Sequence, residues 1–193
     1  MMDTKEKILA AALALYNEKG ISATTRHIAA SMAISPGNLH YHFKHTDDII
    51  LELYSRLAAE MDQLVLELGN GDVKHFIQAS FLVVYKYRFI FLNFVEIAAE
   101  IPSIQQHYFQ LFKRRGKEFK RIFKILVQQG YFRDDIPDAV WTALVNQVFI
   151  VGDFWLSNNE LTRQLEGKEA ATAFYKQMDA MLYPYRADTL PKP

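Results

Sequence analysis

The feature that most constrains this chain is a pair of short helical segments with almost nothing between them. Residues 24–32 and 36–44 both carry apolar residues at helical spacing, and only Ala33-Ile34 and Ser35 separate them. Ser35 followed by Pro36 is typical of a helix start, because serine caps free amide groups and proline has none to satisfy. Two short helices joined by so tight a turn, with a further helix in front of them, predict a helix-turn-helix.

Helical periodicity continues on both sides of this pair, and no segment shows the alternation of a half-buried strand. Ahead of the pair, Asp3 and Glu6 have the spacing of a capping box, and Gly20 supplies a left-handed helix end. Behind it, Thr46 is expected to cap a long helix that ends before Gly69. We therefore predict an all-α protein of about nine helices, with a three-helix helix-turn-helix domain (1–46), a linking helix (47–68) and a larger helical domain (69–193).

Composition and hydropathy exclude several kinds of site. The 193 residues include no cysteine, which rules out disulfides, thiolate metal sites and cysteine nucleophiles. The start of the chain lacks the basic and apolar regions of a signal peptide. The most apolar stretch, residues 89–99, is too short to span a bilayer and contains Asn93 and Glu96. We expect a cytoplasmic protein with no membrane segment, no cofactor and no bound metal.

Residues 35–45, with the sequence SPGNLHYHFKH, contain three histidines and a lysine but no acidic residue. At about 100° per residue, Leu39 and Phe43 fall on the buried face of a helix. The side chains on the outer face and flanks are Gly37, Asn38, His40, Tyr41, His42 and Lys44. Such a helix can enter the major groove, with its outer face against base edges and its flanks beside phosphates. A helix exposed only to water is the alternative, and the histidines diverge too far to predict a metal site.

The stretch from residue 7 to residue 50, KILAAALALYNEKGISATTRHIAASMAISPGNLHYHFKHTDDII, resembles the DNA-binding domain of the TetR family of bacterial repressors. The matching positions are Ile8-Leu9, Ala11-Ala12, Gly20, Thr24-Thr25, Ile28-Ala29, Ile34-Ser35, Gly37, Leu39, His42-Phe43 and Ile49. The resemblance implies that Thr25 and Arg26 touch DNA at the start of the second helix. The expected DNA contacts are then Thr24, Thr25, Arg26, Ser35, Pro36, Gly37, Asn38, His40, Tyr41, His42 and Lys44. The chain departs from the family pattern at His40, His45 and Thr46, the last of which stands where a phosphate-binding lysine is common.

The segment that follows, residues 76–102, is apolar around most of its circumference and rich in aromatic residues. Such a segment either forms a core packed with phenylalanine or lines a cavity. The family resemblance implies an effector pocket, in which Asn93 and Glu96 would orient a small hydrophobic or aromatic ligand. The candidate pocket residues are Phe81, Tyr85, Phe89, Asn93, Phe94, Glu96, Phe112, Trp141 and Phe149.

The last two predicted helices each carry an apolar face that could join two copies of the chain. The residues on these faces are Trp141, Leu144, Val145, Val148, Gly152, Trp155, Phe174, Met178, Met181 and Leu182. Gly152 would allow two helices to cross closely. The alternative is that both faces belong to the core of a single subunit, whereas the resemblance favours a homodimer on a near-palindromic operator.

Taken as a whole, the sequence predicts a TetR-like transcriptional regulator, a dimeric repressor released from double-stranded operator DNA by a small hydrophobic effector. The alternative is a helical small-molecule-binding protein or enzyme that does not bind DNA, with Glu96, Glu100 or His107 in an aromatic cavity. No phosphate-binding loop, metal-binding spacing or nucleophile motif supports an enzyme. We therefore expect no enzymatic activity.

Overall fold

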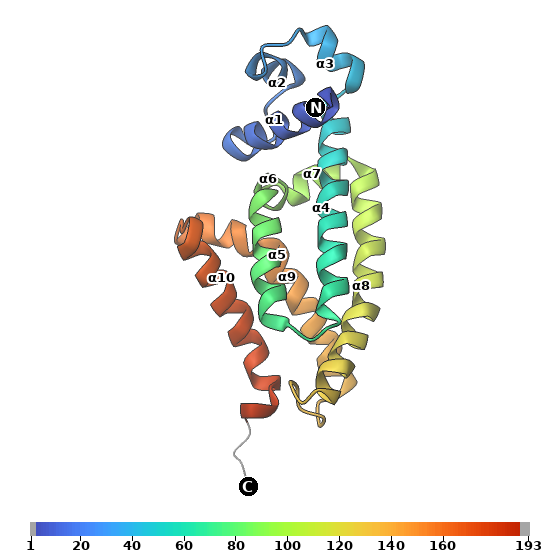
Figure 1. The fold of residues 1–193 in the computed structure, drawn as a ribbon, viewed down its shortest axis with the longest axis vertical. Helices are drawn as coiled ribbons and strands as arrows, with labels where there is room; N and C mark the ends of the chain where they lie inside the picture. Colours follow the sequence, from blue (N-terminus) through green and yellow to red (C-terminus); the bar gives the residue numbers. More distant parts are fainter. Residues whose placement is uncertain (1–2, 190–193) are drawn as a thin grey trace.

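The computed structural model describes residues 3–189, and over that range the chain is helical with no strand (Figure 1). The elements are α1 (Thr4–Lys19), α2 (Thr25–Ser31), α3 (Pro36–His42), α4 (Thr46–Leu68), α5 (Val73–Lys86), α6 (Arg88–Leu92), α7 (Phe94–Glu100), α8 (Pro102–Gln128), α9 (Asp138–Thr162), α10 (Gly167–Leu182) and the short 3-10 helices η1 (Tyr183–Tyr185) and η2 (Ala187–Thr189). The all-α prediction is confirmed. The aromatic segment breaks at Tyr87 and Asn93, whose backbones leave the helical region, so it contributes three α-helices and the described part has ten.

Helices α1, α2 and α3 form a small unit at one end of the molecule, which we call the head (Figure 1). Its core consists of Ile8, Leu9, Ile28, Leu39 and Phe43, all of them buried. These are the apolar positions that the helical spacing assigns to the inner faces of the three helices. The predicted helix-turn-helix is therefore confirmed as a packed unit.

The turn between α2 and α3 depends on a left-handed residue. Ala33 has a φ of 54°, and its N–H donates to the carbonyl oxygen of Ala30 at 3.1 Å. The N–H of Ile34 donates to the carbonyl oxygen of Ala29, also at 3.1 Å. These two bonds satisfy the carbonyl groups at the end of α2 and fix the direction in which α3 leaves the turn. An alanine in this region is strained, because its Cβ crowds the neighbouring carbonyl oxygen.

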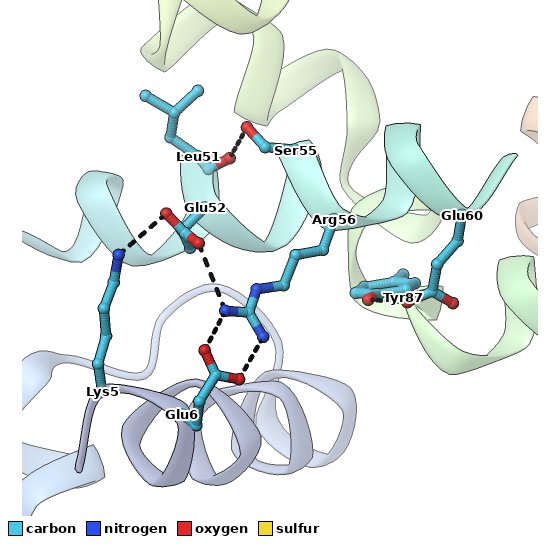
Figure 2. Close-up of polar contacts among 8 residues, drawn as sticks. All are labelled: Lys5, Glu6, Leu51, Glu52, Ser55, Arg56, Glu60 and Tyr87. Carbon is cyan, nitrogen blue, oxygen red and sulfur yellow. Dashed lines mark hydrogen bonds and ion pairs between the residues drawn. The ribbon is translucent and has the colours of Figure 1, made fainter. Parts of the chain in front are cut away.

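Two of the expected helix caps are wrong. The Asp3 side chain makes no capping bond, and Glu6 binds Arg56 of α4 instead, with nitrogen–oxygen distances of 2.7 and 2.5 Å (Figure 2). A bidentate ion pair outweighs a single bond to a helix end. At the start of α4 the capping residue is His45 rather than Thr46, and the His45 N–H donates to the Asp48 carboxylate at 2.8 Å.

Helices α5 to α10 form a second unit, which we call the body. Helix α4 runs from the head along the body, beside α5 and α8, and α10 lies against α5 (Figure 1). Buried residues of all these helices form one continuous apolar core with that of the head. The connection is strengthened where Tyr16 of α1 packs on Phe89 of α6, with ring centroids 5.0 Å apart.

Helix α9 is the one helix, within residues 3–189, that is long and apolar enough to cross a membrane by length and composition. In the fold it packs against α6, α8 and α10. Its inner face carries Trp141, Leu144 and Trp155, which are buried, whereas Ile150 and Phe154 on its outer face are exposed. The helix is thus a core element of the body with an apolar outer face.

Candidate DNA interface and ligand cavity

Two features position the outer face of α3: a helix cap at Ser35 and the burial of Leu39 on the opposite face. Ser35 caps the helix, since its Oγ accepts from the N–H of Asn38 at 3.2 Å. Leu39 is 1% exposed and anchors the helix to the head, whereas Tyr41 is 81% exposed. The exposed residues at the start of the helix and on its outer face are Ser35, Pro36, Gly37, Asn38, His40 and Tyr41.

The end of α3 differs from the helical wheel used for residues 36–44. The helix ends at His42, and Phe43 is extended, with φ −137° and ψ 119°. Phe43 is buried, as the spacing predicted, but from an extended backbone rather than from the helix. Lys44 therefore lies in the connector to α4, where it is exposed. His42 is half-buried and its ring meets that of Tyr41 edge-on at 5.2 Å.

The other predicted DNA contacts lie at the start of α2. Thr24 precedes the helix and is exposed, Thr25 is half-buried, and Arg26 is exposed. The N–H of Thr24 donates to Nδ1 of His27 at 3.1 Å, which fixes the first turn. Helices α2 and α3 lie together at one end of the molecule, at the top of Figure 1. The predicted residues are thus gathered at one end of the head.

A cavity of about 120 Å³ lies in the body, and α4, α5, α6, α7, α8, α9 and α10 all contribute to its wall. The wall is mainly apolar, with Leu57, Met61, Phe91, Phe94 and Phe149 among its residues. Its polar residues are Tyr54, Ser80, Tyr108, Arg115 and Asp153. An apolar pocket with a few polar groups is typical of a small-molecule site.

Only Phe94 and Phe149, of the nine predicted pocket residues, line this cavity. Phe81 and Tyr85 stack on each other at 5.6 Å, and Phe81 also packs on Phe174. Trp141 lies among Phe123, Phe132 and Tyr185 in the aromatic core at the other end of the body. These aromatic residues therefore form part of a packed aromatic core, which was the alternative to lining a cavity.

The remaining four predicted pocket residues also lie outside the cavity wall. Phe89 is buried against Tyr16, and Phe112 packs behind Phe149 with ring centroids 4.8 Å apart. Asn93 donates from its side-chain amide to the carbonyl oxygen of Phe89 at 2.7 Å and so closes the end of α6. Glu96 is exposed. Neither polar residue expected to orient a ligand is in place to do so.

The polar group that the sequence analysis missed is Asp153 of α9. Its Oδ2 accepts a hydrogen bond from the Tyr108 hydroxyl at 2.5 Å. Burial raises the pKa of Asp153 to about 6, and the bond from Tyr108 opposes this rise. Burial, together with the charge of Asp153, raises the pKa of Tyr54 to about 12. A carboxyl group in the apolar sequence FIVGDFWL was the available signal, because an acid among core residues requires a partner.

Arg115 of α8 is the second charged group of the wall. Its side chain is 7% exposed and binds Asp62 of α4 and Glu118 of its own helix, the latter at 2.6 Å. Arg114 adds a further contact to Asp62 at 2.8 Å. The charge of Arg115 is therefore compensated by two carboxylates, and the pair with Asp62 fastens α8 to α4.

Comparison with known proteins identifies the family. A model of the TetR-type bacterial transcriptional repressors matches residues 52–189, and a model of the N-terminal domain of the tetR family of bacterial regulatory proteins matches residues 8–53. The chain belongs to the TetR family. Because the first match covers most of the chain, the membership does not depend on the helix-turn-helix alone.

Three individual proteins are similar to this chain in sequence or in fold. The chain is 30% identical over 66 residues to the HTH-type transcriptional regulator AcrR of Shigella flexneri, a match that covers 34% of this chain and 31% of the relative. A TetR-family regulator from Marinobacter aquaeolei VT8 is 29% identical, with a TM-score of 0.85 over 96% of this chain and 92% of that one. The regulator SmeT, solved with triclosan, is 19% identical, with a TM-score of 0.66 over 98% of each chain.

The expected dimer residues of this TetR-family chain are mostly interior to one subunit. Seven of them are buried: Trp141, Leu144, Val145, Trp155, Phe174, Met178 and Leu182. Val148 and Gly152 line the cavity, and Met181 is half-buried. No atom of the same subunit lies within 4 Å of a Cβ placed on Gly152, so no close helix crossing within the subunit requires that glycine. The most apolar face of α9 packs inward, because an amphipathic helix turns its larger apolar stripe towards the core.

The three residues named for the alternative enzyme hypothesis do not lie together in the structure. Glu96 and Glu100 are exposed on α7, whereas His107 lies on α8 with its Nδ1 3.1 Å from the Tyr54 hydroxyl oxygen. Within the described residues there is no group of three or more histidine and acidic side chains arranged to hold a metal ion. The family and its solved members are transcriptional regulators.

Proposed function

We propose that this TetR-family protein is a cytoplasmic, dimeric repressor that leaves its operator when a small, largely apolar effector enters the body cavity. The observation that carries the proposal is the path of α4. This helix starts directly behind the recognition helix α3 and contributes Tyr54, Leu57, Ala58, Met61 and Val65 to the cavity wall. Its 23 residues span roughly 34 Å at about 1.5 Å each, so one rigid element joins the two sites.

A second connection supports the coupling of cavity and head. The side chain of Asn17 in α1 donates to the carbonyl oxygen of Lys86 at 2.8 Å and accepts from the N–H of Phe89 at 3.1 Å. The next two residues, Ile90 and Phe91, line the cavity. An effector that favours another position of α4 and α6 would shift the population of head orientations away from the one that fits DNA.

Because most of the predicted interface residues are buried within one subunit, we place the proposed dimer contact on other surfaces. The outer face of α9 exposes Ile150, Phe154 and Leu161, at 60%, 42% and 86%. Tyr183, just after α10, is 57% exposed. We propose that these outer faces of α9 and α10 join two subunits around a two-fold axis. The two α3 helices would then face half-sites about 34 Å apart on a near-palindromic operator.

The proposal is tested by fluorescence anisotropy with duplex DNA from upstream of the gene, against a scrambled duplex and across a salt series. Asn38→Ala is expected to cost about 1–3 kcal/mol and to relax specificity at one base pair. Lys44→Ala should weaken binding to all sequences and lower the salt slope by about one unit. Lys74→Ala, an exposed change at the start of α5, is the matched control and should bind as wild type does.

Either of two results would refute the DNA assignment. One is that Asn38→Ala and Lys44→Ala bind like the Lys74→Ala control on an operator selected from a random library. The other is that wild-type protein shows no preference for any duplex in that selection. The second result would instead favour a ligand-binding protein without affinity for DNA.

A further inference from the structure

The cavity wall contains one carboxylate, that of Asp153, which forms no ion pair with a basic side chain of the described residues. Asp153 has the Tyr108 hydroxyl on its Oδ2, but no ion pair among residues 3–189 involves it. Two other titratable groups share the cavity wall, Tyr54 on α4 and Arg115 on α8. The guanidinium of Arg115 is already bound by Asp62 and Glu118, so it does not neutralise Asp153.

We propose that the cavity binds an organic ammonium compound of about one aromatic ring, whose charged nitrogen pairs with Asp153. The inference rests on the proposed effector role of the cavity and assigns the chemical class of its ligand. A carboxylate in an apolar wall is costly unless it is paired, and a ligand cation supplies the missing partner. The pKa of Asp153, raised by burial to about 6, leaves the group ionised at neutral pH and able to form this pair.

The surroundings of Asp153 suit a cation with an apolar substituent. The rings of Phe94 and Phe149 both contact that of Tyr108, with centroids 4.8 and 6.5 Å from it. Tyr54 adds a further ring to the wall of the same cavity. Aromatic faces attract ammonium groups through their quadrupoles, most strongly where water is excluded. The same rings provide the apolar surface against which a hydrocarbon substituent packs.

The size of the cavity limits the ligand. Its volume of about 120 Å³ is close to that of an engineered protein cavity of roughly 150 Å³ that binds benzene. The volume therefore limits the ligand to about one ring with at most a short aminoalkyl arm, and it excludes a steroid or a long acyl chain. An anion is disfavoured, because it would meet the Asp153 charge and find Arg115 already paired.

The experiment measures binding calorimetrically, without DNA, for three probes that share a ring and differ in polar group: benzylamine, benzyl alcohol and phenylacetate. We expect wild type to bind benzylamine at least tenfold more tightly than the other two. Asp153→Asn, which keeps the shape and an acceptor for Tyr108, should lower the affinity for benzylamine by tenfold or more. It should leave the affinity for benzyl alcohol within twofold. Asp134→Asn, the same change at an exposed carboxylate outside the cavity wall, is the matched control and should retain benzylamine binding.

Equal affinities for benzylamine and benzyl alcohol in the wild type would overturn the inference, as would tightest binding of phenylacetate. Unchanged benzylamine affinity in Asp153→Asn would do so as well, and so would the absence of binding by any probe. Wild-type affinity for benzylamine should also fall between pH 7 and pH 5 as Asp153 is protonated, and this fall should be absent from Asp153→Asn. Since no DNA is present, a failure of operator binding would count against the proposed function and leave this result standing.

Discussion

The burial of Asp153 predicts that the ligand-free protein is less stable at neutral pH than it would be with an amide at this position. The pKa of Asp153 rises from an ordinary value of 3.8 to about 6 because the carboxylate is buried. At roughly 1.36 kcal/mol per pH unit, this rise corresponds to a cost of about 3 kcal/mol above pH 6. Asp153→Asn removes the charge and keeps an acceptor for the Tyr108 hydroxyl. We therefore expect it to raise the free energy of unfolding by up to about 3 kcal/mol at pH 7.5.

The pH dependence distinguishes this effect from a general improvement in packing. Between pH 3.8 and about 6 the folded state binds more protons at Asp153 than the unfolded state, so this group lowers stability as pH rises. The advantage of Asp153→Asn should thus be full above pH 6 and shrink towards zero near pH 4. Urea unfolding of both proteins at half-unit pH steps measures the difference. A variant no more stable than wild type at pH 7.5, or an advantage that persists unchanged at pH 4, would refute the reasoning.

Three further predictions concern the head, its joint with the body and the dimer. Ala33→Gly removes about 1–2 kcal/mol of left-handed backbone strain, but glycine costs about 0.5–1 kcal/mol more conformational entropy on folding. We therefore expect the free energy of unfolding, measured by thermal unfolding, to rise by roughly 0.5–1 kcal/mol. The control Ala30→Gly, inside α2, should lower the free energy of unfolding by about 1 kcal/mol. Asn17→Ala removes two hydrogen bonds at the α5–α6 junction, one to the exposed Lys86 carbonyl and one from the part-buried Phe89 N–H, and should cost about 1 kcal/mol, measured by calorimetry. Phe154→Glu on the outer face of α9 should convert the dimer to a monomer in sedimentation velocity, and a dimer of unchanged affinity would place the interface elsewhere.

The head was predictable because its determinants are local. A serine cap followed by proline, a two-residue turn and inward residues at helical spacing each act within one or two helical turns. Leu39 and Phe43 are buried as the spacing requires. The prediction fails at the ends of the helices, where α3 stops at His42 and leaves Phe43 extended, and where a distant arginine binds Glu6 in place of the expected cap.

The cavity could not be predicted in the same way, because it depends on how seven helices pack. The aromatic segment has apolar residues on all sides, so its sequence does not distinguish Phe94, which lines the cavity, from Phe89, which packs on the head. The inward face of α9 was identified correctly as an apolar stripe, but periodicity does not tell whether its partner belongs to the same subunit. Asp153 indicates the position of the cavity better than periodicity does, since an acidic residue within an apolar stripe marks a place where core side chains do not fill the interior.

Under the proposed function, the position of Arg56 would allow ligand and DNA binding to be coupled without large movements. Arg56 points from α4 towards the head and binds Glu6 of α1 and, at 3.4 Å, Glu52 of its own helix (Figure 2). The next two residues, Leu57 and Ala58, line the cavity. Consecutive residues of a helix are separated by about 100°, so a rotation that moves residue 57 away from a ligand necessarily displaces the guanidinium that holds α1. The Arg56 guanidinium also lowers the pKa of Glu6, which keeps the pair charged at neutral pH. Under the proposed function, a ligand that favoured another packing of α4 would change the orientation of the head, because Arg56, which binds α1, is adjacent in sequence to the cavity residue Leu57.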